Sequence, residues 1–159
     1  MEITELAKQL TELQDIEAIQ KLKAEYCDIC DDAHNPERIV TIFAPDGIWE
    51  AEGVGYAQGP AELRTLFTSF ADRISFSQHH VFNPRITVNG TEAHGTWYFL
   101  GPFTFRKDQR QIWIAARYED DYIKVEGTWK FKHLHAFNRM LAPYEEGWEV
   151  RSKVDVFTN

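Results

Sequence analysis

The second half of the chain consists of regularly alternating apolar and polar residues. From Ser75 onward this alternation replaces helical spacing, and it is typical of strands with one buried face. Four long strands are expected, over 77–88, 92–106, 109–122 and 127–140. Asn89-Gly90, which joins the first two, is a strong hairpin signal because both residues readily adopt positive φ. The pattern therefore predicts a mainly antiparallel and strongly curved sheet of consecutive hairpins.

The first half of the chain has helical spacing. Residues 3–31 are expected to form one long helix, or a short helix that runs into a longer one. A second, short helix follows, in which Asn35 suits the N-cap and Pro36 suits the first helical position. A third helix opens at Gly59-Pro60. Helices followed by a run of strands predict an α+β domain with the helices packed on one side of a bent sheet.

Only a short segment separates the second and third helices. Residues 44–47 have the composition of a turn, and residues 48–52 read as a strand that ends at Gly53 and Gly55. No repeat, low-complexity segment or linker interrupts the sequence. A single domain over 1–159 is therefore expected.

Composition and charge narrow the possible partners. The formal net charge of −8 argues against nucleic acid and anionic membranes, because both bind basic surfaces. No apolar run reaches the roughly 18 residues of a transmembrane helix. Residues 1–5 lack the basic-then-apolar plan of a signal peptide, so a cytoplasmic protein is expected. Aromatic residues make up 14% of the chain, which suits a fold around a large apolar cavity.

The two cysteines, Cys27 and Cys30, form a C-x-x-C motif. A redox pair would sit at a helix N-terminus, where the helix dipole lowers the pKa of a thiol, whereas this pair lies near a helix C-terminus. A zinc site would need a second pair of ligands, and the sequence contains no other cysteine. Buried free thiols are the simpler interpretation.

The end of the first helix carries two candidate functional groups. Tyr26 falls near the middle of the apolar stripe and directs its hydroxyl inward. Asp31 lies about 140° away on an ideal helical wheel, so the helix must end or tighten there for the carboxylate to turn inward. Asp32, Asn35 and Pro36 supply such a stop. Tyr26 could equally be a core residue with a satisfied hydroxyl, and Asp31 could merely serve the turn.

Alternation within the strands selects further candidates. His79 and His80 point to opposite faces of a strand, and parity alone leaves open which of them looks inward. In the last strand, provided that no bulge intervenes, one face carries Trp129, Phe131, His133, His135, Phe137 and Arg139. Arg139 could bind a carboxylate or enolate, or it could form a surface or interface ion pair.

Mostly apolar side chains from several elements are expected to contact a substrate. They are Trp49, Val81, Tyr98, Ile114, Tyr118 and His135. Trp49 can equally be a core or interface residue. His133 and His135 form a His-x-His that could bind a metal ion, but no third histidine or acidic ligand is obvious in the sequence. We therefore predict neither a metal site nor a cofactor.

Three helices, a curved meander and the spacing Tyr-x-x-x-x-Asp from Tyr26 to Asp31 together resemble the SnoaL-like branch of the NTF2-like superfamily. That branch includes scytalone dehydratase, bile acid 7α-dehydratase and the lindane dehydrochlorinase. The sequence most resembles bile acid 7α-dehydratase-like sequences, and the resemblance runs from Asp15 to about Arg139. It implies a cone-shaped sheet with helices that enclose a pocket, and a homodimer or homotrimer. An acidic residue that follows the family's Trp-Tyr pair corresponds here to about Gly101.

The resemblance also implies roles for individual residues. The family's tyrosine and aspartate match Tyr26 and Asp31. Its histidine, which precedes a Pro-x-Ile-Thr segment, matches His79. Its arginine falls on Asn138 or Arg139, and strand parity favours Arg139.

These residue types can remove a proton from carbon. His79, oriented by Asp31, would be the general base. Tyr26 could donate to a developing negative charge or a leaving hydroxyl, and Arg139 could hold a substrate carboxylate or enolate. We therefore predict a cofactor-independent lyase or isomerase that acts on a hydrophobic cyclic compound, with dehydration as the first choice. Two alternatives stay open: a small-molecule binding domain without turnover, and a structural subunit similar to the β subunit of ring-hydroxylating dioxygenases.

Overall fold

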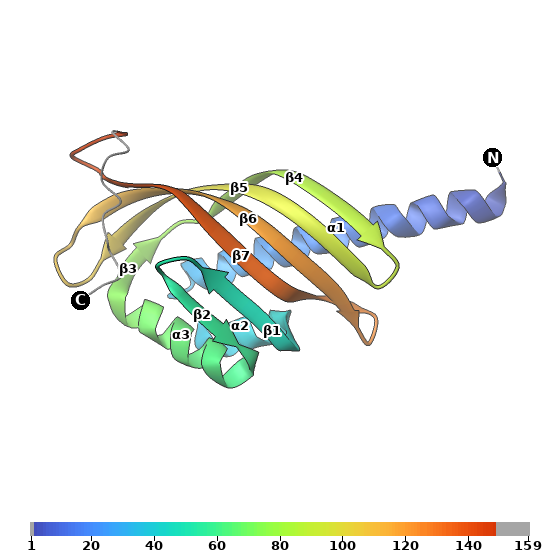
Figure 1. The fold of residues 1–159 in the computed structure, drawn as a ribbon, viewed down its shortest axis with the longest axis horizontal. Helices are drawn as coiled ribbons and strands as arrows, with labels where there is room; N and C mark the ends of the chain where they lie inside the picture. The colour runs from blue at the N-terminus through green and yellow to red at the C-terminus, as the bar shows by residue number, and fades with distance from the viewer. Residues whose placement is uncertain (1, 149–159) are drawn as a thin grey trace.

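Figure 1 shows the computed structural model, which describes residues 2–148. The helices are α1 (Ile3–Asp31), α2 (Pro36–Ile42) and α3 (Gly59–Arg73). The strands are β1 (Phe43–Ala51), β2 (Gly55–Gln58), β3 (Ile74–Ser77), β4 (His80–Asn89), β5 (Glu92–Phe105), β6 (Gln111–Val125) and β7 (Thr128–Pro143). The expected order of helices first and a meander afterwards is confirmed, and the fold is α+β.

The strands form one curved sheet in the order β2-β1-β7-β6-β5-β3, with β4 also paired to β5. β4 to β7 are consecutive antiparallel hairpins, as the alternation predicted. β1 runs parallel to β7, so the sheet is mixed rather than wholly antiparallel. The parallel pair arises because the chain passes from α2 directly into β1, which joins the edge of the meander beside the last strand.

The structure differs from the sequence-based prediction of the strands in three places. The expected strand over 77–88 is divided into β3 and β4, and Gln78 and His79 lie between them. Residues 44–47 belong to β1, whose pairing with β7 shifts register between Phe43 and Ile48. β2 was not predicted, because its four residues are too few to show a period.

Two bulges interrupt the pairing of β6 and β7. Tyr122 pairs with Phe131 and Asp121 pairs with His133, which leaves Lys132 as an extra residue. Ala115 pairs with Met140 and Ala116 pairs with Asn138, which leaves Arg139 as an extra residue. Each bulge reverses the alternation of the strand.

The first bulge changes which side chains of β7 reach the interior. Phe131 is buried, but beyond Lys132 the inward positions are Leu134, Ala136 and Asn138. The prediction that His133, His135, Phe137 and Arg139 continue the face of Phe131 was therefore wrong. Phe137 and Arg139 are exposed, and the two histidines are half-buried on the outer face.

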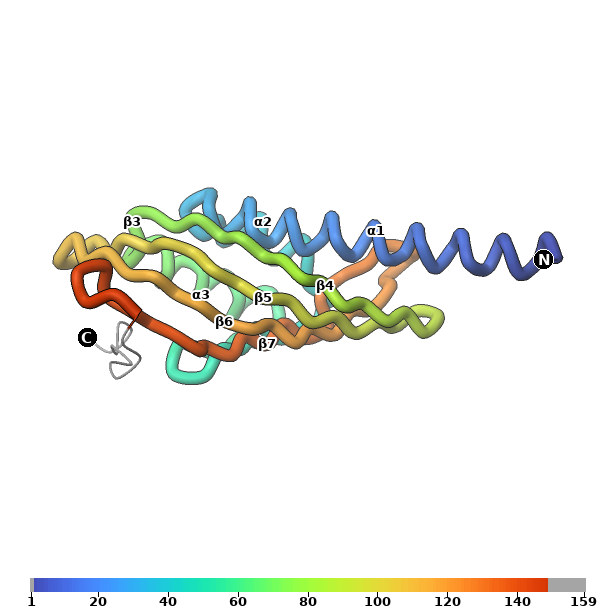
Figure 2. Tube along the Cα trace, turned by 90° about the horizontal axis from the view of Figure 1, so that it is seen from above, coloured from blue at the N-terminus to red at the C-terminus, as the bar shows by residue number. Residues whose placement is uncertain are grey.

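The helices cover the concave side of the sheet. α3 packs under β1 and β2, and α1 runs along β4, as the two views in Figure 1 and Figure 2 show. The N-terminal part of α1 extends past the end of the sheet. Among the described residues, no helix combines the length and apolar character needed to cross a membrane.

Candidate active site

A cavity lies between the helices and the concave face of the sheet. It contains about 560 Å³ of space outside the atoms, including its open mouth. Most of its wall is apolar, and the side chains with polar atoms that line it are Tyr26, His34, Trp49, His79, Tyr118 and Asn138. A largely apolar cavity with a few converging polar groups is typical of a small-molecule site.

His79 and Asp31 form a close pair at the cavity wall. Nδ1 of His79 lies 2.7 Å from Oδ1 of Asp31, and the backbone N–H of His79 donates to Oδ2 at 2.9 Å. Ser77 Oγ is 3.2 Å from Asp31 Oδ1. Because the carboxylate accepts a hydrogen bond from Nδ1–H, the proton of a neutral ring is assigned to Nδ1 and the lone pair to Nε2.

Burial and this hydrogen bond set the charge of the pair. The His79 side chain is only 6% exposed, and burial lowers the pKa of the imidazole despite the opposing effect of Asp31. For Asp31, burial opposes ionisation, but hydrogen bonds from His79 and Ser77 outweigh it and lower the pKa of the carboxyl. At neutral pH the pair is therefore a neutral imidazole beside a carboxylate.

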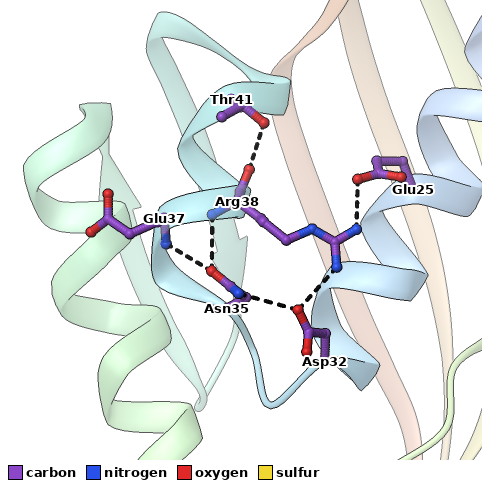
Figure 3. Close-up of polar contacts among 6 residues, drawn as sticks. All are labelled: Glu25, Asp32, Asn35, Glu37, Arg38 and Thr41. Atoms are coloured by element: carbon purple, nitrogen blue, oxygen red, sulfur yellow. Dashed lines mark hydrogen bonds and ion pairs between the residues drawn. The ribbon is translucent and has the colours of Figure 1, made fainter.

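The turn after α1 places Asp31 beside His79, which lines the cavity. α1 ends at Asp31, as the sequence predicted, and Asn35 caps α2 by accepting from the backbone N–H of Glu37 and Arg38. Arg38 binds Asp32 at 3.0 Å and Glu25 at 2.8 Å, and the Asn35 amide donates to Asp32 (Figure 3). These contacts hold the end of α1 against the start of α2.

The break between β3 and β4 places His79. The backbone N–H of Gln78 donates to the carbonyl of Pro102 on β5. At Gly101 a Cβ atom would lie 2.3 Å from the carbonyl oxygen of Gln78, a distance that no side chain allows. Gly101 therefore permits the close approach of the segment that carries His79. The acidic side chain that the family resemblance aligns with about this position would displace that segment, so Gly101 is a departure from the family's pattern.

Tyr26 lies in the same wall. Its hydroxyl accepts a 3.0 Å hydrogen bond from Trp49 Nε1, and its ring meets the His79 ring edge-on at a centroid distance of 6.3 Å. Burial raises the pKa of Tyr26 well above its ordinary value. The phenol is therefore neutral at physiological pH and can act as a hydrogen-bond donor.

His34 is a site residue that sequence reasoning missed. It follows α1 in the left-handed region, with φ of 51°, and this conformation turns its ring into the cavity. Burial and the nearby His79 lower the pKa of His34 to about 3, so the ring stays neutral. The available signal was the position of a histidine directly after a helix end, because His is enriched among non-glycine residues with positive φ.

The other predicted residues divide into two groups. Trp49, Ile114 and Tyr118 line the cavity, as does Asn138, the alternative to Arg139. Absent from the described cavity wall are Val81, Tyr98, His135 and Arg139. Val81 packs against the core, and Tyr98 is 38% exposed on the opposite face of β5. The bulge at Lys132 turns His135 and Arg139 away from the cavity, and strand parity alone could not reveal it.

A buried ion pair supports the cavity from behind. Lys23 Nζ lies 2.8 Å from Asp120 Oδ2 and 3.4 Å from the ring centroid of Tyr118, and both charged side chains are fully buried. Tyr122 donates to the same carboxylate oxygen at 3.0 Å. The pair joins α1 to β6 and fixes the ring of Tyr118. Local sequence spacing could not predict this pair, because its partners are 97 residues apart.

One group of potential metal ligands adjoins the cavity. Ligand atoms of Cys30, His34 and His79 lie within 4.8 Å of one another. However, Nδ1 of His79 already contacts Asp31, and burial raises the pKa of the Cys30 thiol well above its ordinary value. The arrangement therefore favours proton transfer over metal binding. Cys27 and Cys30 are buried free thiols, as predicted.

Comparisons with known proteins agree with this architecture. A family model described as a SnoaL-like domain matches residues 11–135. Gamma-hexachlorocyclohexane dehydrochlorinase of Sphingobium indicum is 27% identical over 132 residues, which are 79% of this chain and 81% of that protein.

Solved structures are similar over most of the chain. The crystal structure of LinA is 26% identical, with a TM-score of 0.79, and the match covers 85% of this chain and 92% of that one. A candidate scytalone dehydratase from Novosphingobium aromaticivorans is 25% identical, with a TM-score of 0.78, and the match covers 86% of this chain and 91% of that one.

Proposed function

Because the chain belongs to the SnoaL-like family, we propose that it is a cofactor-independent lyase that performs a β-elimination on a hydrophobic cyclic compound. The observation that carries the proposal is the 2.7 Å contact between Asp31 and Nδ1 of His79 at the wall of an apolar cavity. It leaves Nε2 as the basic nitrogen of a ring that is neutral at physiological pH.

His79 would remove a proton from a carbon atom next to the carbon that bears the leaving group. The electron pair of the broken C–H bond becomes the new double bond, and the leaving group departs with its own bonding pair. Asp31 would stabilise the imidazolium that forms. A general base of this kind accelerates a reaction by a factor of about 10²–10⁴.

Tyr26 is the best-placed proton donor for a leaving hydroxyl. It is a neutral phenol in the same wall, and its hydroxyl position is fixed by Trp49. Transfer of the phenolic proton would release water, and the proton on His79 would later restore the phenol through solvent. His34 and Asn138 add neutral hydrogen-bonding groups that can orient a carbonyl or hydroxyl of the substrate.

The names of the relatives favour an elimination reaction, but they do not agree on the leaving group. One is a dehydrochlorinase and another a candidate dehydratase, and both names describe the loss of a proton and a leaving group from one molecule. We propose dehydration as the primary reaction. Isomerisation or cyclisation would use the same first proton transfer and no leaving group.

A substrate panel tests this proposal. The protein is incubated with cyclic β-hydroxyketones and with hexachlorocyclohexanes, and loss of water or of hydrogen chloride is followed by mass spectrometry. We expect elimination from at least one compound class and a drop of about 10²–10⁴ in rate for His79→Ala.

His80→Ala is the matched control, because His80 is the neighbouring, exposed imidazole and contacts Gln78 rather than Asp31. It should retain wild-type turnover. Binding without turnover across the panel would instead support a carrier, and equal activity in His79→Ala would exclude His79 as the base.

A further inference from the structure

Three potential metal ligands come together on the outer face of the sheet, away from the cavity. They are Glu50 on β1 and His133 and His135 on β7. Their neighbours Trp49 and Ala136 point the opposite way and line the cavity. The group is therefore separated from the candidate active site by the thickness of the sheet.

The parallel pairing and the first bulge of β7 create this arrangement. The bulge at Lys132 turns His133 and His135 outward, and the register places Glu50 directly beside His135. Glu50 is 83 residues from His133 in the chain. The carboxylate that the His-x-His motif lacks in the sequence is thus supplied by another strand.

The distances suit a small cation. His133 Nε2 lies 3.0 Å from Glu50 Oε2, and one ligand atom from each of the three residues lies within 4.8 Å of the others. A metal ion about 2.0–2.2 Å from nitrogen and oxygen ligands keeps those ligands roughly 3–3.6 Å apart. The Glu50–His133 pair already meets this spacing, and binding at His135 requires its ligand atom to move from within 4.8 Å of the other two ligand atoms to this spacing.

The two imidazoles are arranged side by side. Their rings are stacked, with a 5.3 Å centroid separation and a 14° angle between planes. The His133 and Glu50 side chains are 30% and 36% exposed, so solvent can supply the remaining ligands. Such a set, two imidazoles and one carboxylate with open positions, is typical of zinc and related ions.

The surrounding charges favour a cation. Glu119 and Asp121 on β6 pair with His135 and His133 respectively, and Tyr56 on β2 pairs with Glu50. β6 carries two cations, of which Arg117 lies 3.6 Å from Glu119 and Lys124 is paired with Asp15 at 2.7 Å. Asp121 is engaged by His94 at 2.8 Å.

We propose that Glu50, His133 and His135 bind a divalent first-row transition-metal ion such as Zn²⁺. The bound ion would connect β1 to β7, which is the parallel pair that attaches the first half of the chain to the meander. It would therefore stabilise the fold without entering the cavity.

Cobalt titration tests the site, because Co²⁺ accepts the same ligands as Zn²⁺ and absorbs visible light. The full-length protein is freed of metal with a chelator and titrated with Co²⁺, and Zn²⁺ is then added to displace it. We expect saturation at one ion per chain. We also expect the midpoint temperature of thermal unfolding to rise by about 5–10 °C at a Zn²⁺ concentration 100-fold above its dissociation constant.

Single substitutions locate the ion. Glu50→Gln, His133→Gln and His135→Gln should each weaken binding by at least about tenfold. His94→Gln is the matched control, because His94 is an exposed imidazole paired with the carboxylate of Asp121 but belongs to no group of three potential ligands among the described residues. It should bind Co²⁺ as the wild type does.

Two results would overturn the proposal. One is the absence of saturable Co²⁺ binding. The other is binding that survives the three substitutions but is lost in His34→Gln and shows the intense absorption of a thiolate ligand, since this would locate the ion at Cys30, His34 and His79.

Discussion

His34 and His79 lie side by side in the cavity wall, with ring centroids 6.0 Å apart. Burial keeps both rings uncharged near neutral pH, but only His79 has a carboxylate partner. His79 can therefore accept a proton with a hydrogen bond to Asp31 as compensation, whereas Asp31 acts on the pKa of His34 only through its charge, and burial and His79 outweigh that effect. This difference assigns the role of base to one of two neighbouring imidazoles.

The pKa of His34 predicts a specific loss of stability in acid. The unfolded chain protonates this histidine below about pH 6.5, while the folded protein does so only near pH 3. Protons therefore favour the unfolded state between these values. Between pH 7 and pH 5 the free energy of unfolding should fall by about 2 kcal/mol through His34 alone.

Urea unfolding of His34→Asn at the two pH values isolates this contribution, because asparagine tolerates positive φ and does not titrate. The variant should lose about 2 kcal/mol less stability than the wild type on going to pH 5. His80→Asn should keep the wild-type pH dependence. An unchanged dependence in His34→Asn would show that His34 is not held neutral.

At the scale of secondary structure, the turn from α1 to α2 carries the site. It contains two consecutive residues at positive φ, Ala33 and His34, and it is held by Asn35, Arg38 and Asp32. Because Asp31 directly precedes this turn, the contacts in Figure 3 fix the end of the helix that presents the carboxylate.

Removal of the α2 cap should loosen this turn. Asn35→Ala deletes the acceptor for two backbone N–H groups and should lower the free energy of unfolding by about 1 kcal/mol. Asn35→Asp retains the acceptor and should restore most of the loss. Chemical denaturation measures both, and equal stability of Asn35→Ala and wild type would contradict a capping role.

Long periodic elements were predictable from the sequence, whereas irregular ones were not. The helix ending at Asp31, the cap at Asn35 and the buried alternation of Ile112 to Tyr118 follow from local spacing. The extra residue at Lys132 has no local signature, because one inserted residue leaves the apolar pattern on each side intact. That single bulge moved His135 and Arg139 out of the predicted site.

At the scale of the whole molecule, contacts between distant segments determine the cavity and its supports. The pairs Asp31–His79, Lys23–Asp120 and Glu50–His133 join residues 48, 97 and 83 positions apart. The first was predicted only through the family resemblance, and the other two were not predicted. The expected homodimer or homotrimer stays a prediction.

Removal of one partner from the buried pair between α1 and β6 should strongly destabilise the fold. Lys23→Met leaves the buried carboxyl of Asp120 without its partner cation, which should cost about 3–5 kcal/mol. The double variant Lys23→Met/Asp120→Leu removes both charges and should recover much of the loss.

Lys132→Met is the matched control, because Lys132 forms an exposed ion pair with Glu92. It should change the free energy of unfolding by less than about 1 kcal/mol. Urea denaturation of the three variants decides the question, and a single Lys23→Met variant as stable as wild type would contradict a structural role for the pair.

Nitrogen-15 NMR of the histidine side chains, with the His79 signal assigned by its loss in His79→Ala, tests the proposed base without knowledge of the substrate. The expected result at pH 7 is a neutral His79 ring with its proton on Nδ1 and a pKa below the ordinary value of about 6.5. Asp31→Asn should lower that pKa further, because the carboxylate is what raises it. An imidazolium at pH 7, or a neutral ring with its proton on Nε2, would contradict the role of His79 as the base.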